Sequence, residues 1–203
     1  MESFQGKNTN IKISDRLQDG IEVIKNGGLV ATKTDTIYGI LADAFNPESV
    51  EKIYNIKERE LDKPFIILIP DLDCLEKFNV SVNDKARKIL STKGITVILK
   101  VENPEKFEYL HRGTKKLAFR IPDDHEFLKF LKELNRPVVA PSCNPSGLEP
   151  AKNIEEAINY FSDKIDLYIN RGEVINNIPS TIVETENGKV KIVRHGSKKL
   201  EVL

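Results

Sequence analysis

Short, continuous apolar runs, separated by helical patterns, constrain the fold more than any other feature of this sequence. Four runs stand out: residues 28–32 (GLVAT), 65–69 (FIILI), 95–99 (ITVIL) and 137–141 (PVVAP). A strand covered on both faces is apolar at successive positions, whereas a half-exposed strand alternates. A fifth run, 117–121 (LAFRI), is similar but contains Arg120. The runs predict a central sheet with helices packed against it, which is an α/β architecture.

Helical patterns lie between these runs. Ser14 is a candidate N-cap for a first helix, which Gly27 and Gly28 would end. Asn46 and Pro47 predict the cap and first position of a second helix. Further helical patterns cover residues 71–78, 83–90, 124–134 and 153–161, the last with Asn153 as its cap.

In the C-terminal part, strand patterns replace the alternation of apolar runs and helices. Residues 180–185 and 189–196 flank Glu-Asn-Gly, which predicts a β-hairpin. The first ten residues are polar, so we expect a flexible N-terminus at 1–10 and one domain at 11–203. The predicted fold is a single α/β domain with a twisted sheet of mixed parallel and antiparallel strands.

Composition narrows the functional classes. Among 203 residues, Lys+Arg and Asp+Glu both number 31, so the net charge is zero. Zero net charge disfavours non-specific nucleic-acid binding, although a local basic groove stays compatible with it. Cys74 and Cys143 lack the spacing of a metal site or a redox pair. With no signal peptide and no apolar run long enough to span a bilayer, we expect a cytoplasmic protein without membrane contact.

A basic cluster precedes one of the apolar runs. Lys57, Arg59 and Lys63 lie just before Pro64, where a predicted helix gives way to a strand. Cations at a helix end can simply offset its dipole. Ligands of open α/β sheets bind at strand ends, however, and three cations there suit a polyphosphate. Both interpretations are open from the residues alone.

Other polar groups also follow apolar runs. The run after Pro141 forms either a turn or a loop that holds phosphate oxygens; it contains Ser142, Asn144, Ser146 and Gly147. Arg120 forms either a structural ion pair or a binding site for a carboxylate or phosphate. The stretch KTDTIYGILAD at 33–43 is either a polar turn or the lip of a site for a small charged ligand.

Taken in order, these stretches resemble the YrdC-like family of threonylcarbamoyl-AMP synthases. The resemblance runs from GGLVATKTDTIYGILADAFN to IVRHG and covers nearly the whole chain. Its motifs are Thr-Asp-Thr-x-Tyr-Gly, Lys-x-Arg with a following Lys-Pro, Arg-x-Pro, Ser-x-Asn with Ser-Gly, and Ser-Thr before a final strand that ends in Arg. Because the chain stops soon after Arg194, it resembles the short, single-domain form.

The resemblance implies a YrdC-like fold and a nucleotidyltransferase activity, that of an L-threonylcarbamoyladenylate synthase. The amine of L-threonine takes up bicarbonate to give a carbamate, whose oxygen attacks the α-phosphate of ATP, with Mg²⁺ assisting. Threonylcarbamoyl-AMP and pyrophosphate result. Threonylcarbamoyl-transferase machinery then modifies the adenosine beside the anticodon of certain tRNAs.

The resemblance also implies roles for individual residues. Lys57 and Arg59 would be catalytic, and Thr34 and Tyr38 would form the pocket wall. Threonine would contact Thr36, Arg120, Ala140 and Ser180. ATP would contact Arg59, Lys63, Lys116, Ser142, Asn144, Pro150 and Arg194. No side chain is implied as a metal ligand.

The sequence departs from the family pattern at several positions. Lys33 replaces a frequent Pro, Lys116 replaces a common Thr, and Thr92-Lys93-Gly94 replaces a Pro-Gly-Pro turn. Two alternatives therefore stay open beside the synthase. One is a module of the same fold that binds tRNA or double-stranded RNA. The other is a divergent paralogue without synthase activity, such as a regulatory domain that binds nucleotide without turnover.

Overall fold

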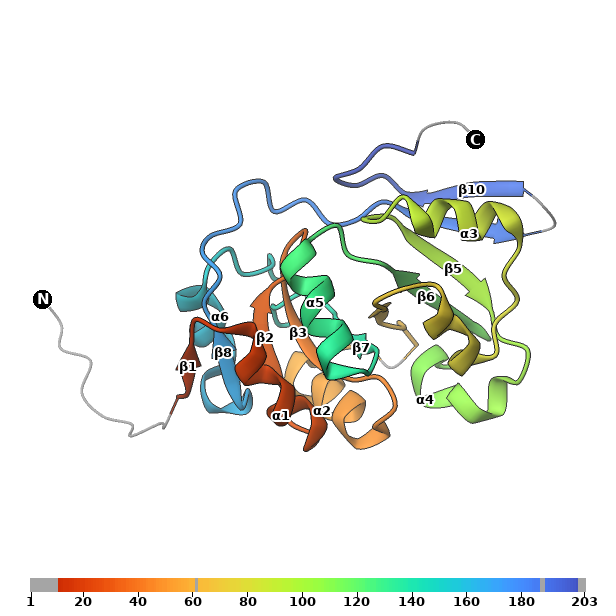
Figure 1. The fold of residues 1–203 in the computed structure, drawn as a ribbon. Coiled ribbons are helices and arrows are strands. Elements are labelled where there is room, and N and C mark those ends of the chain that lie inside the picture. Colours follow the sequence, from red (N-terminus) through yellow and green to blue (C-terminus); the bar gives the residue numbers. More distant parts are fainter. Residues whose placement is uncertain (1–10, 61, 187–188, 201–203) are drawn as a thin grey trace, which may run out of the picture.

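The five apolar runs all contribute strands to one ten-stranded sheet (Figure 1). The computed structural model describes residues 11–60, 62–186 and 189–200. The strands are β1 (Ile13–Ser14), β2 (Val30–Lys33), β3 (Tyr38–Asp43), β4 (Ile66–Leu68), β5 (Thr96–Lys100), β6 (Lys116–Arg120), β7 (Val138–Val139), β8 (Leu167–Ile169), β9 (Ile182–Glu186) and β10 (Lys189–Arg194).

Six α-helices accompany the sheet in the described residues: α1 (Gly20–Lys25), α2 (Pro47–Lys57), α3 (Asp84–Ser91), α4 (Glu108–His111), α5 (His125–Leu134) and α6 (Ile154–Phe161). Short 3₁₀ helices cover Leu17–Asp19, Asp73–Phe78, Pro104–Phe107 and Ser162–Lys164. None of the helices in the described ranges is long and apolar enough to cross a membrane.

The strand order is β1-β8-β2-β3-β7-β4-β6-β5-β9-β10. Four neighbouring pairs are parallel: β1–β8, β2–β8, β4–β6 and β5–β9. The remaining five pairs are antiparallel. The predicted mixed sheet is therefore confirmed.

Helices cover both faces of the sheet, which explains the continuous apolar runs. On one face, α1 and α5 pack their apolar side chains against residues such as Leu41 and Leu68. On the other face, α2, α3 and α6 pack against residues such as Ile40 and Ile67. Because successive residues of a strand point to opposite faces, both Ile40 and Leu41 enter a core.

Helix caps test the local predictions. Asn46 accepts a hydrogen bond from the backbone N–H of Ser49, and Asn153 accepts one from Glu156, so both predicted caps are confirmed. The cap at Ser14 was wrong, because α1 begins only at Gly20. Ser14 lies in β1, and its hydroxyl instead donates to the carboxylate of Asp19.

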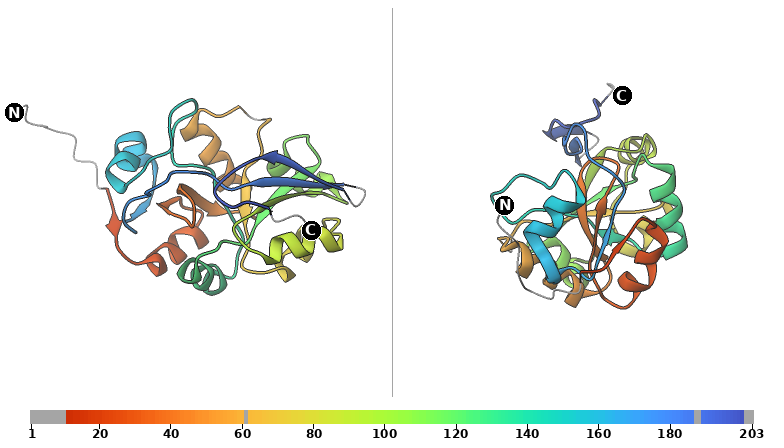
Figure 2. Two further views of the ribbon diagram at one scale, coloured as in Figure 1. Left: turned by 90° about the horizontal axis from the view of Figure 1, so that it is seen from above. Right: turned by 90° about the vertical axis from the view of Figure 1, so that its left-hand side faces the viewer.

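Strand β3 is the main element that the sequence patterns did not predict. The stretch 33–43 contains a turn only at residues 34–37, after which Tyr38–Asp43 forms a fully buried strand antiparallel to β2. The predicted C-terminal hairpin is confirmed as β9 and β10. It lies beside β5, as Figure 2 shows from above. The predicted flexible N-terminus at 1–10 and residues 187–188 of the predicted turn lie outside the described part of the chain.

Candidate functional site

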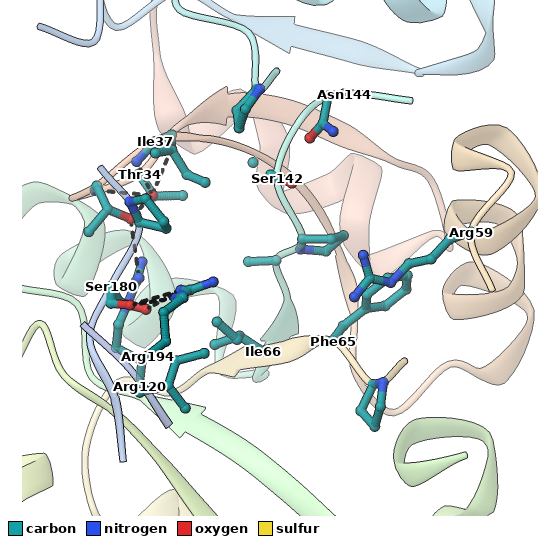
Figure 3. A pocket seen from close by; sticks show the side chains of 18 of the residues that line it. Thr34, Ile37, Arg59, Phe65, Ile66, Arg120, Ser142, Asn144, Ser180 and Arg194 are labelled. Atoms are coloured by element: carbon teal, nitrogen blue, oxygen red, sulfur yellow. Dashed lines mark hydrogen bonds between the residues drawn. The ribbon is translucent and has the colours of Figure 1, made fainter. Parts of the chain in front are cut away.

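A cavity of about 390 Å³ opens where several strand ends and loops meet (Figure 3). Its walls come from the β2–β3 turn, the segment after α2, the end of β6, the loop after β7, and the segments around β9 and β10. Ten residues that the sequence singled out line it together: Thr34, Thr36, Arg59, Arg120, Ala140, Ser142, Asn144, Pro150, Ser180 and Arg194.

The β2–β3 turn presents hydroxyl groups at one end of the cavity. Thr34 is nearly buried, and both its backbone N–H and its hydroxyl donate to the carbonyl of Ile37. The backbone N–H of Thr36 in turn donates to the Thr34 hydroxyl. These bonds close the turn and hold the Thr36 side chain within reach of Arg120.

Arg120 ends β6 at the same end of the cavity. One guanidinium nitrogen, Nη1, donates to the Thr36 hydroxyl at 3.1 Å, and Nη2 pairs with Asp35 Oδ1 at 2.5 Å. The buried Nε has no hydrogen-bond partner among the described residues. A buried donor without a partner costs free energy, and Arg120 is among the residues that line the cavity.

Ser180 and Arg194 complete this end. The Ser180 hydroxyl lies 2.8 Å from that of Thr96 on β5. Arg194 donates from Nε and Nη2 to the Ser180 carbonyl, at 3.1 and 2.8 Å. Burial lowers the pKa of Arg194, and the positive charge of Arg120 lowers it further. The two arginines are therefore close enough to repel each other, which favours an anionic ligand between or beside them.

The loop after β7 forms another wall. Ser142 pairs with Gly39 on β3, and the backbone N–H of Cys143 donates to the Tyr38 carbonyl. Asn144 Nδ2 donates to the carbonyls of Pro145 and Leu148, at 2.9 and 2.7 Å. Its buried Oδ1 has no donor in the described ranges. The loop is thus fixed, and both Ser142 and Asn144 line the cavity.

Arg59 lies on the other side of the cavity, next to Phe65 (Figure 3). Its Nε donates to the Lys63 carbonyl at 3.2 Å, and its guanidinium lies 5.4 Å from the centre of the Phe65 ring. Burial lowers the pKa of Arg59. Among the described residues, three arginines but no Asp or Glu line the cavity, so the cavity favours anionic ligands.

Lys57 differs from the expectation that it points toward a phosphate rather than the core. Its side chain is buried, and Nζ donates to the carbonyls of Ser142 and Asn144 behind the cavity wall. Burial lowers the pKa of this ammonium from 10.5 to about 8. The structure makes Lys57 a support of the Ser142–Asn144 loop.

Three further predicted residues lie outside the cavity lining. Tyr38 is buried, donates to the Gly172 carbonyl at 3.0 Å, and has a pKa raised to about 12 by burial. Lys63 pairs with Glu60 at the surface. Lys116 begins β6, four residues before Arg120, and pairs with Glu184 on β9. The predicted ATP contacts of Lys63 and Lys116 stay predictions.

The sequence patterns missed several residues of this site. The lining also includes Ile66, Phe65, Leu148 and Ile182. Phe65 and Ile66 lie in a predicted apolar run and Ile182 in the predicted hairpin, but neither pattern placed them at a ligand. Leu148 is 54% exposed in the loop after β7, and no pattern singled it out. Asp35 was also given no role, although a carboxylate between two threonines in a buried turn was a signal for an arginine partner.

Comparison with known proteins identifies the family. The model of the Sua5/YciO/YrdC family, described as "Telomere recombination", matches residues 22–196. The chain belongs to this family. A relative from Methanocaldococcus jannaschii named "Putative threonylcarbamoyl-AMP synthase" is 36% identical over 177 residues, which cover 85% of this chain and 82% of the relative.

Two further comparisons concern Pyrococcus abyssi. Its "Threonylcarbamoyl-AMP synthase" is 29% identical over 88% of this chain, but the chain spans only 53% of that relative. A solved structure of P. abyssi Sua5 complexed with L-threonine superposes with a TM-score of 0.81 at 26% identity. That match covers 92% of this chain and 57% of the solved one. The fold predicted from the resemblance is thereby confirmed.

Proposed function

We propose that this protein is an L-threonylcarbamoyladenylate synthase, a nucleotidyltransferase acting on L-threonine, bicarbonate and ATP. One observation carries the proposal. A single cavity has Arg120 and Arg194 at one end and Arg59, with the fixed Ser142–Asn144 loop, at the other. Such a cavity suits a molecule with two anionic groups. The names of the M. jannaschii and P. abyssi relatives, and the L-threonine bound to P. abyssi Sua5, support the same activity.

At the amino-acid end, Arg120 would bind the carboxylate of threonine through donors not used by Asp35 and Thr36. An arginine fork matches a carboxylate in shape and charge. The hydroxyls of Thr36 and Ser180 would bind the threonine hydroxyl. Ile66 and Ile182 line the same cavity and would contact its methyl group.

At the nucleotide end, Arg59 would bind phosphate oxygens, and Ser142, Asn144 and Pro150 would contact the nucleoside. Arg194, which lies beside Ser180 and Arg120, would contact the nucleotide from the amino-acid end of the cavity. The threonine amine and bicarbonate give a carbamate and water. The carbamate oxygen then bonds to the α-phosphorus of ATP as the bond to pyrophosphate breaks. This chain would act by holding the two reactants in line and by offsetting negative charge.

Mg²⁺ fits this site as a companion of ATP. The cavity lining, in the described residues, contains no carboxylate to hold the ion. Mg²⁺ at nucleotide sites is commonly bound by phosphate oxygens and water, with few protein ligands. When bound, it would neutralise phosphate charge. We further propose that the product serves threonylcarbamoyl transfer to tRNA by other proteins.

The test is incubation of the protein with ATP, Mg²⁺, bicarbonate and radiolabelled threonine. We expect a labelled adenylate, formed together with pyrophosphate and dependent on each substrate. ATP and threonine binding without turnover would instead support the nucleotide-binding paralogue. Absence of ATP binding, together with RNA affinity that falls steeply with salt, would support the RNA-binding module.

A further inference from the structure

A buried carboxylate lies directly behind the arginine at the amino-acid end. The side chains of Asp35 and Arg120 are only 3% and 5% exposed, and Asp35 does not line the cavity. Asp35 therefore cannot reach a ligand in the way that Arg120 can. Its role must act through the residues that it contacts.

Both carboxylate oxygens of Asp35 are engaged. Oδ1 accepts from Arg120 Nη2 at 2.5 Å, and Oδ2 accepts from the backbone N–H of Asp123 at 3.0 Å. Asp35 thus links the β2–β3 turn to the end of β6 and to the segment just after it. With two fixed donors, the carboxylate is held in one orientation.

This contact fixes the plane of the Arg120 guanidinium. The group is rigid and planar, so anchoring Nη2 on Asp35 and Nη1 on Thr36 leaves little freedom to rotate. The unpartnered Nε and the remaining N–H bonds then hold a constant direction. Asp35 also supplies the negative charge that offsets Arg120, which would otherwise lie unpaired near Arg194.

We propose that Asp35 is a positioning residue that sets the orientation of Arg120 for the carboxylate of the amino-acid substrate. The inference rests on the proposed function and extends it to a residue outside the cavity lining. Loss of Asp35 should weaken binding of ligands through their carboxylate and leave the nucleotide end unaffected. A purely structural role would weaken all ligands together.

The test compares Asp35→Asn, which keeps the volume of the side chain, with the natural protein. Affinity is measured by calorimetry for L-threonine, L-threoninamide and ATP. We expect threonine affinity to fall by about tenfold or more, the equivalent of one charge-assisted hydrogen bond. Threoninamide lacks the carboxylate, so its affinity and that of ATP should stay within about twofold.

Asp123→Ala is the matched control. It removes a carboxylate that pairs with Lys198 at the surface but keeps the backbone N–H that binds Asp35. Threonine affinity should be unchanged in this variant. Equal losses for threonine and threoninamide in Asp35→Asn, or no loss for either, would overturn the proposal.

A second pair of variants serves if Asp35→Asn does not fold. Arg120→Gln and the double variant Asp35→Asn/Arg120→Gln remove the buried charge on one or both sides. If Asp35 acts through Arg120, the single and double variants should bind threonine with equal affinity. A lower threonine affinity in the double variant would refute the inference. If the natural protein binds no threonine at all, the proposed function fails first and this inference fails with it.

Discussion

Replacing Lys57 with Met tests whether this residue supports a loop or binds phosphate. Met keeps most of the side-chain volume but removes the ammonium that donates to the Ser142 and Asn144 carbonyls. Backbone contact is retained, because the Ser146 N–H still donates to the Lys57 carbonyl. The change is therefore confined to the loop support.

Two opposing effects set the change in the free energy of unfolding. The two carbonyls lose their donor, at about 1–3 kcal/mol each. Removing the buried charge, whose pKa is lowered from 10.5 to about 8, relieves about 3 kcal/mol. We expect a net destabilisation of no more than about 3 kcal/mol, so the variant should remain folded.

The assay is calorimetric binding of ATP and of adenosine to Lys57→Met. A displaced loop should weaken both ligands by the same factor, about tenfold, because its Ser142 and Asn144 would face the nucleoside. Lys52→Met is the control, since Lys52 lies on the same helix and donates to the Gly27 carbonyl away from the cavity. A large loss for ATP with none for adenosine would show a phosphate ligand and refute this reasoning.

Three further predictions follow from particular contacts. Because folding lowers the pKa of Lys57, the unfolded chain binds more protons than the folded one between about pH 8 and 10.5. In denaturant titrations, the free energy of unfolding of the natural protein minus that of Lys57→Met should therefore rise across that window. A difference that does not change with pH would contradict this. A Cβ on Gly196 would lie 2.2 Å from the Pro179 carbonyl oxygen and 2.3 Å from the Ser180 carbonyl carbon. Gly196→Ala should therefore destabilise the protein by about 1–3 kcal/mol and weaken threonine binding. Ser197→Ala, at an exposed position, should do neither. Threonine should be preferred over valine by about 10⁴-fold and over serine by about 10–200-fold in adenylate formation, and equal turnover of valine would exclude a hydroxyl-binding pocket.

Much of the fold followed from local patterns. Strands β4, β5 and β7 were predicted because each is an uninterrupted apolar run, and two asparagine caps were predicted from spacing alone. Strand β3 was missed because its first residues, Tyr38 and Gly39, continue a polar turn. Its burial comes from pairing with β2 and β7, which no local pattern reveals.

The sequence predicted which residues lie at the site but not where each of their side chains points. The ordered motifs brought Arg59, Arg120 and Arg194 to one cavity. The direction of Lys57 depends on a loop 85 residues later in the chain, so the sequence could not give it. Lys116 precedes Arg120 by four residues of one strand, which places it about 13 Å along β6.

The origin of the carbamate carbon tests the central claim most directly. Bicarbonate labelled with carbon-13 is supplied with unlabelled threonine, ATP and Mg²⁺, and the adenylate product is analysed by mass spectrometry. The account predicts an adenylate that carries one labelled carbon together with threonine. An adenylate of threonine without that carbon, or no adenylate from a folded protein that binds both ATP and threonine, would contradict it.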